Sequence, residues 1–161
     1  HWQERTHVEF IELTSKNRQN YSDYVIFSPA SGTTCASYVG RMGGPQIVSL
    51  SPRCNKMITV HEIGHVLGLW HEQSRTDRDQ YVQILWENIE INHEYNFNQH
   101  FTDGRDYGEY HYQSIMHYAP FAFSKNGLPT IIPLMPGVEI GQRREISPKD
   151  IAAVNAMYPE A

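Results

Sequence analysis

The pattern of hydrophobic and polar positions predicts several short strands, followed by one buried helix. Stretches that mix β-branched or aromatic residues with polar ones are typical of strands, and they occur at residues 7–13, 24–27, 37–41 and 46–50. Residues 57–69 contain no proline and are apolar on most faces, which is typical of a buried helix. The first part of the chain is therefore predicted to be a sheet with one helix packed against it.

The pattern is less regular after residue 71. Residues 92–100 are compatible with a short helix, and residues 104–120 form a loop rich in tyrosine and glycine. A last amphipathic helix is predicted over residues 147–158, because Ser147 is a good N-cap and Pro148 suits the first helical position. Its core face consists of apolar residues three positions apart: Ile151, Val154 and Met157.

This order of elements predicts a single α+β domain over residues 1–161, with two lobes and a cleft between them. We expect the N-terminal lobe to span about residues 1–71 and the C-terminal lobe about residues 72–161. A chain of 161 residues is long enough to bury a core.

The composition excludes several classes of protein. With 40% hydrophobic and 19% charged residues, the chain is an ordinary globular protein rather than a disordered one. No apolar run approaches the ~20 residues that a transmembrane helix needs, so no membrane partner is expected. The net charge of −5 argues against a nucleic-acid partner.

The run HEIGHVLGLWH at residues 61–71 predicts a catalytic zinc site. His61 and His65 lie at positions i and i+4, so a helix directs both imidazoles toward one ion. Glu62 stands where a carboxylate can reach a water on that ion, and Gly68 allows the turn that brings back His71 as a third ligand. Three nitrogens and one open position are typical of catalytic zinc. The alternative, a helix whose histidines only cap or are solvated, requires five fixed positions to match by accident.

The only two cysteines, Cys35 and Cys54, do not form a C-x-x-C pair. Paired in a disulfide, they would close a loop just before the zinc helix and stabilise the fold by about 3 kcal/mol. The alternative is two buried free thiols in a cytosolic protein, because the cysteine count does not decide the compartment.

Motifs along the whole chain resemble those of the astacin family of zinc endopeptidases. HExxHxxGxxH followed by a methionine turn is the metzincin pattern, and residues 114–118 supply that turn as SIMHY. The zinc run continues as HEQSRTDRD over residues 71–79, where Glu72 separates astacins from other metzincins. SYVGR at 37–41 and IGQR at 140–143 also match.

The resemblance implies roles for individual residues. His61, His65 and His71 would bind one Zn²⁺ ion, and Tyr118 would be a further, displaceable ligand. Glu62 would act as general base and later as general acid, while Met116 would form an apolar floor beneath the metal. The plain alternatives are ordinary core packing for Met116 and a half-buried loop position for Tyr118. The remaining histidines, at positions such as 93, 100, 111 and 117, are expected to be surface or core residues rather than ligands.

The resemblance also implies how a substrate binds. An extended peptide would pair antiparallel with an edge strand at about residues 35–41, where Cys35 and Ser37 offer backbone groups. Arg143, and less certainly Arg144, would line the pocket for the residue after the cut and favour acidic side chains there. A solvated surface arginine is the alternative for Arg143.

The fold that the resemblance implies is the two-lobed metzincin catalytic domain. Its N-terminal lobe has a twisted, mostly parallel sheet with an antiparallel edge strand and the zinc helix, and its C-terminal lobe is largely irregular with a final helix. The N-terminal part of the family domain lies upstream of His1 and is missing from this sequence. In the family, the mature N-terminus pairs with the glutamate at the Glu72 position, so here Glu72 is expected to need another partner.

We therefore expect a secreted, monomeric zinc endopeptidase acting on protein or peptide substrates. The resemblance implies a precursor inhibited by its propeptide, and a disulfide between Cys35 and Cys54. One alternative is a catalytically silent domain that binds peptides, against which the retention of Glu62 argues. Another is a zinc hydrolase that acts on small amides.

Overall fold

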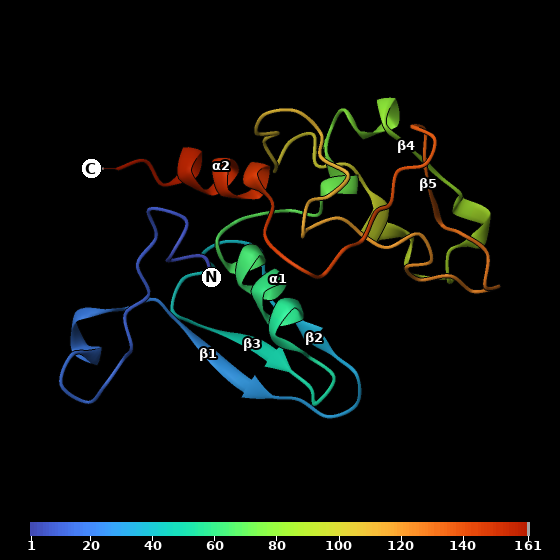
Figure 1. Cartoon of the computed structure of the whole chain (residues 1–161). Coiled ribbons are helices and arrows are strands. Elements are labelled where there is room, and N and C mark those ends of the chain that lie inside the picture. Colours follow the sequence, from blue (N-terminus) through green and yellow to red (C-terminus); the bar gives the residue numbers. More distant parts are fainter. Residues whose placement is uncertain (161) are drawn as a thin grey trace. The chain divides into compact units, whose positions relative to one another are not determined.

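The computed structural model describes residues 1–160 and divides into two compact units (Figure 1). The first contains His1–Leu69 together with the C-terminal segment from Val154 onward. The second contains Trp70–Ala153. Each unit has its own sheet and is described separately.

The first unit is built on a three-stranded sheet covered by a helix. Its strands are β1 (Tyr24–Pro29), β2 (Cys35–Ala36) and β3 (Pro45–Leu50), in the order β1-β3-β2. β1 pairs parallel with β3, and β2 pairs antiparallel with β3. Figure 1 shows α1 (Lys56–Val66) lying over this sheet. The strands predicted at 24–27 and 46–50 and the α+β class are therefore confirmed. The edge strand predicted at about 35–41 is antiparallel, as expected, but covers only Cys35–Ala36.

Helix α1 begins and ends at residues whose chemistry suits those positions. The Asn55 side chain accepts hydrogen bonds from the backbone N–H groups of Met57 and Ile58, both at 3.0 Å, as an N-cap does. The chain leaves the helix after Val66, before the predicted end at residue 69. Gly68 has a φ of +102°, a left-handed conformation that favours glycine and turns the chain away.

Two predicted strands are wrong, for one physical reason. A strand needs a neighbouring strand to pair its backbone groups. Residues 7–13 have none among the described residues, and the Phe10 N–H instead bonds to the Gln3 side chain. Residues 37–41 leave the sheet after β2, because Ser37 Oγ and Gly40 N donate to backbone carbonyls of α1, at 2.9 and 2.8 Å.

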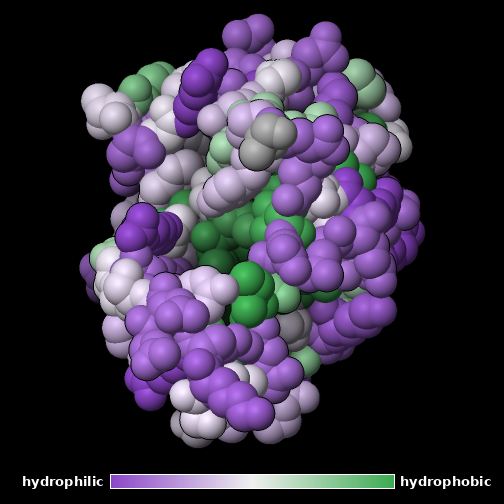
Figure 2. All heavy atoms as spheres, turned by 90° about the vertical axis from the view of Figure 1, so that its left-hand side faces the viewer, coloured by the Kyte–Doolittle hydropathy of each residue, from purple (hydrophilic) through white to green (hydrophobic). Residues whose placement is uncertain are grey.

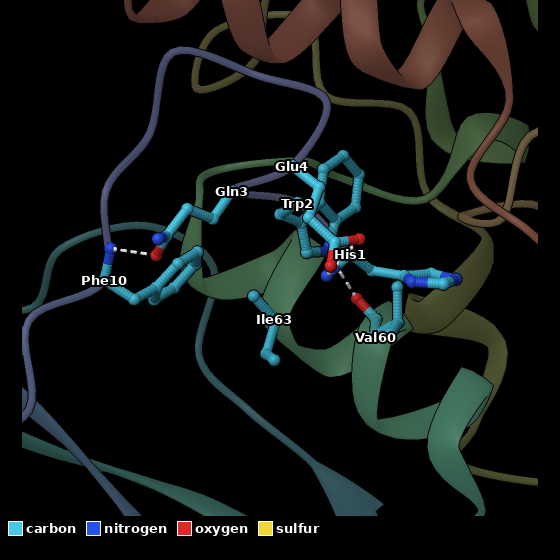
Figure 3. A pocket seen from close by; sticks show the side chains of 7 residues that line it. All are labelled: His1, Trp2, Gln3, Glu4, Phe10, Val60 and Ile63. Carbon is cyan, nitrogen blue, oxygen red and sulfur yellow. Dashed lines mark hydrogen bonds and ion pairs between the residues drawn. The ribbon is translucent and has the colours of Figure 1, made fainter.

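The N-terminal segment packs against the outer face of α1. Trp2 is buried, and its indole Nε1 donates to the Val60 carbonyl at 2.9 Å (Figure 3). Beside Trp2 lies a cavity of about 310 Å³ with Phe10 and Ile63 in its wall. Figure 2 shows hydrophobic surface gathered near the middle of one face, with hydrophilic residues around it.

A disulfide closes the loop before α1. Cys35 of β2 is bonded to Cys54, with 5.9 Å between the two Cα atoms. The disulfide alternative for these cysteines is therefore confirmed, and the alternative of two free thiols is excluded.

The second unit consists mainly of loops around an apolar cluster. Its two strands, β4 (Val82–Ile84) and β5 (Ile131–Pro133), pair antiparallel. Isoleucine and aromatic side chains fill the core beside them, with Ile89, Phe97 and Ile131 fully buried. Residues 104–120 contain no helix or strand, as predicted. The two short strands were not predicted.

Several single turns of 3₁₀-helix interrupt the loops. They are η1 (Arg18–Asn20), η2 (Glu72–Ser74), η3 (Arg78–Gln80), η4 (Trp86–Asn88) and η5 (Glu94–Phe97). The helix suggested at 92–100 is thus only the short turn η5.

The predicted final helix is α2 (Pro148–Met157). Ser147 Oγ accepts the Asp150 N–H at 3.1 Å, which is an N-cap bond. Val154 on the predicted core face is fully buried. Among residues 1–160, no helix is both long and apolar enough to cross a membrane.

Candidate metal centre

Helix α1 carries two of the predicted ligands and the predicted general base. His61, Glu62 and His65 are all buried, each with 5% of its surface exposed. The imidazole rings of His61 and His65 lie edge to face, with 4.7 Å between their centroids. Ser37 Oγ donates to the Glu62 carbonyl, which attaches the chain after β2 to this part of α1.

The orientation of His65 suits a metal ligand. Its Nδ1 lies 2.8 Å from the Leu69 carbonyl oxygen. Because a carbonyl can only accept, Nδ1 carries the proton and Nε2 keeps its lone pair. A bond of this kind fixes the ring of a metal-bound histidine and its tautomer.

His71 completes a group of three donors. One ligand atom each from His61, His65 and His71 lies within 4.8 Å of the other two. Three imidazole nitrogens suit zinc, and three protein ligands leave a position open for chemistry. The three histidines that the sequence singled out are therefore compatible with a zinc site.

The methionine turn is fastened by a buried carboxylate that the sequence analysis missed. Met116 is 1% exposed, and its N–H donates to Ser114 Oγ at 3.0 Å. Asp150 accepts hydrogen bonds from Ser114 Oγ at 2.6 Å and from the N–H groups of Ile115 and Ser147, at 3.0 and 2.8 Å. The Ser147-x-x-Asp150 spacing is a capping signal that the sequence does carry.

Tyr118 lies beside the third histidine. Its ring centroid is 4.2 Å from that of His71, and it also packs against Phe97 and Phe123. Its backbone N–H donates to Gln73 Oε1 at 3.0 Å. The position of Tyr118 next to His71 suits its predicted role as a further ligand.

His117 is a buried core residue, as expected for a histidine outside the ligand set. It is fully buried, and burial lowers its pKa to about 4. Its Nε2 lies 2.6 Å from the hydroxyl of Tyr110, whose own pKa is raised by burial. No motif in the sequence marks Tyr110 as the partner of His117.

Glu72 has partners other than a mature N-terminus, as expected from the sequence. Its Oε1 accepts the His111 N–H at 2.7 Å and lies 3.8 Å from Arg75 Nε. Burial nevertheless raises the pKa of Glu72 to about 7, although Arg75 and the His111 N–H oppose the shift.

We expect Glu72→Gln to be more stable, relative to the wild type, at pH 8 than at pH 5. The folded pKa of about 7 lies above the ordinary value of 4.5, so folded protein keeps a proton that unfolded chain loses. The stability that Glu72 contributes is complete below pH 4.5 and is lost as the pH rises through 7. Between pH 5 and pH 8, the difference in unfolding free energy between Glu72→Gln and the wild type should change by up to about 3 kcal/mol, at 1.4 kcal/mol per pKa unit.

Urea unfolding of both proteins at the two pH values measures this change. The exposed Glu145→Gln is the matched control and should show no such difference. A Glu72→Gln protein whose relative stability is the same at both pH values would contradict the raised pKa.

The predicted substrate-binding residues lie in two places, at strand β2 and beside the methionine turn. Cys35 pairs with Leu50 in the sheet, and Ser37 follows at the end of β2. The half-buried Arg143 donates from Nη1 to the carbonyls of His117 and Gln142, at 2.9 and 2.8 Å. Arg143 is therefore held against the methionine turn rather than being a solvated surface arginine.

Comparisons with known proteins agree with these features. Zinc metalloproteinase nas-13 from Caenorhabditis elegans is 48% identical over 139 residues, which cover 84% of this chain and 30% of that protein. Bone morphogenetic protein 1 from Xenopus laevis is 43% identical over 169 residues, covering 98% of this chain and 23% of that protein. The chain therefore spans less than a third of the length of these relatives.

A solved structure shares the fold. The high choriolytic enzyme 1 of Oryzias latipes, a hatching enzyme zinc-protease, is 40% identical and has a TM-score of 0.85, covering 98% of this chain and 76% of that one. The peptidase family described as Astacin matches residues 1–159. This chain therefore belongs to the astacin family.

Proposed function

We propose that the chain is the catalytic part of a zinc endopeptidase that cleaves extended protein substrates. The observation that carries this proposal is the group of His61, His65 and His71, with Glu62 next to the first ligand on the same helix. When bound, zinc polarises a carbonyl oxygen and lowers the pKa of a bound water toward neutrality.

Glu62 is the group that moves protons. Its carboxylate takes a proton from the attacking water and later passes one to the nitrogen of the departing amine. The burial of Glu62 supports this role, because it largely keeps bulk water away from this residue.

Tyr118 stabilises charge on the substrate. Its ring lies beside that of His71, so its phenol would be a further ligand of a bound zinc ion, and it would donate a hydrogen bond to the substrate oxygen as that oxygen becomes negative. Met116 forms part of the apolar floor of the site.

The substrate binds in extended form along β2. This strand lies at the edge of the sheet, so one side of its backbone is available for pairing. The bond from Ser37 to α1 joins that edge to the helix turn that carries Glu62. Arg143 favours an acidic residue after the cut, and a peptide library with no such preference would remove this part of the proposal.

The protein acts outside the cell as a monomer, made as a precursor whose propeptide inhibits it. The disulfide between Cys35 and Cys54 supports this location, because such bonds persist in oxidising compartments.

A chelator should abolish hydrolysis of casein, and added zinc should restore it. Stripping the metal removes the Lewis acid while the disulfide and both cores remain, so the loss is reversible. Casein cleavage is measured before stripping, after stripping and after adding back zinc. Unchanged cleavage by the stripped protein would contradict the metal-dependent function, and a zinc-loaded protein that binds but never cuts peptides would favour a silent binding domain.

A further inference from the structure

A chain of two hydrogen bonds runs from Tyr110 through the His117 ring to the backbone of Tyr118. The Tyr110 hydroxyl lies 2.6 Å from His117 Nε2, and His117 Nδ1 lies 2.8 Å from the Tyr118 carbonyl oxygen. Tyr110 is 5% exposed and His117 is fully buried. Water therefore has little access to the bond between Tyr110 and His117, whereas the bond to Tyr118 is partly buried.

The direction of each bond follows from the chemistry of its atoms. The Tyr118 carbonyl can only accept, so His117 Nδ1 carries the proton. In the neutral ring, Nε2 then has a lone pair, and the Tyr110 hydroxyl must be the donor. The Tyr118 carbonyl thus fixes the tautomer, and the Tyr110 hydroxyl pairs the nitrogen on the other side of the ring.

The peptide groups around Tyr118 are held from several directions. Gln73 Oε1 accepts the Tyr118 N–H at 3.0 Å, and Arg143 Nη1 donates to the His117 carbonyl at 2.9 Å. Tyr110 is itself fixed, because its ring stacks on that of Tyr81 with 4.6 Å between centroids and an interplanar angle of 8°. These contacts together hold the backbone of Tyr118 in one position.

We infer that Tyr110 and His117 are positioning residues for Tyr118. This inference rests on the proposed function, in which the phenol of Tyr118 would donate a hydrogen bond to the substrate oxygen. Such a side chain needs a fixed backbone pivot, because a displacement of about 1 Å can reduce the rate a hundredfold. The two hydrogen bonds from Tyr110 through His117, here called the relay, hold the backbone of Tyr118 in place and do not involve its phenol.

The first test is Tyr110→Phe, which removes the donor and keeps the ring that stacks on Tyr81. We expect kcat to fall about tenfold, with KM within twofold of the wild type. Tyr118→Phe marks the effect of losing the phenol itself. The control is Tyr112→Phe, which removes another hydroxyl of the same tyrosine cluster, one that donates to the Tyr81 carbonyl at 2.8 Å, and it should leave kcat unchanged.

A second readout uses the metal-free protein. Nitrogen NMR of the His117 ring should show a protonated Nδ1 in the wild type, Tyr112→Phe and Tyr110→Phe, because the Tyr118 carbonyl is unchanged. The chemical shift of Nε2 should differ from the wild type only in Tyr110→Phe, which loses the hydrogen bond to that nitrogen. The Tyr118 amide should also exchange with solvent faster in Tyr110→Phe than in the control.

Replacing His117 separates positioning from simple packing. His117→Asn keeps an N–H near the place of Nδ1 and should recover part of the kcat that His117→Leu loses, although neither variant restores the volume of the ring. Equal kcat in these two variants, or a wild-type kcat and Nε2 chemical shift in Tyr110→Phe, would overturn the relay. An inactive wild type would instead refute the proposed function, and the NMR result would still decide whether the relay exists.

Discussion

Replacing Glu62 by glutamine should remove peptide cleavage and leave zinc binding intact. Glutamine keeps the shape of the side chain in its buried position on α1, where the natural residue is 5% exposed. The amide cannot take a proton from water, so general-base catalysis is lost. We expect kcat/KM to fall by about a thousandfold, within the range of 10²–10⁴ typical of such groups.

Zinc content and peptide cleavage, measured on the same sample, test this expectation. Zinc content by atomic absorption should remain at one ion per chain, because His61, His65 and His71 are unchanged. The exposed Glu87→Gln serves as control and should keep both zinc and activity. Normal cleavage by Glu62→Gln would refute the role of this carboxylate, whereas loss of zinc would assign the carboxylate to the metal site instead.

The metal centre could be predicted because its geometry is local. His61 and His65 are one helical turn apart, and Gly68 with its positive φ redirects the chain toward His71 within a few residues. Short-range spacing decides such a site, so the sequence carries it. The N-cap and first turn of α2 were predictable for the same reason.

Sheet pairing was less predictable, because it depends on what lies alongside. Residues 7–13 have the composition of a strand but no neighbouring strand among the described residues. The strands β4 and β5 have only three paired positions, from Val82↔Pro133 to Ile84↔Ile131, too few for a period of two to stand out.

Polar contacts between residues far apart in the sequence could not be predicted either. The capping signal of Ser147 and Asp150 is visible in the sequence, but not that the same carboxylate reaches Ser114, 36 residues earlier in the chain. Likewise, nothing in the residues between Tyr110 and His117 indicates that the two side chains meet. These contacts exist only once the loops have folded.

Asp150→Ala should strongly destabilise the second unit. The carboxylate is 5% exposed and accepts three hydrogen bonds, which join the start of α2 to the methionine turn. Its removal leaves buried N–H groups of Ile115 and Ser147 without an acceptor. A hydrogen bond to a charged group contributes about 1.5–3 kcal/mol, so we expect a loss of about 3–5 kcal/mol.

Thermal unfolding measures this loss, and a chain of this size should melt roughly 10 °C lower. Asp150→Asn should lie between the alanine variant and the wild type, because its single carbonyl oxygen can replace only one of the two carboxylate acceptors. Lys149→Ala, at the exposed neighbouring position, should change the melting temperature little, since its ion pair with Glu109 is on the surface. If Asp150→Ala has the same melting temperature as Lys149→Ala, the methionine turn is held by its apolar packing around Met116 and not by the carboxylate.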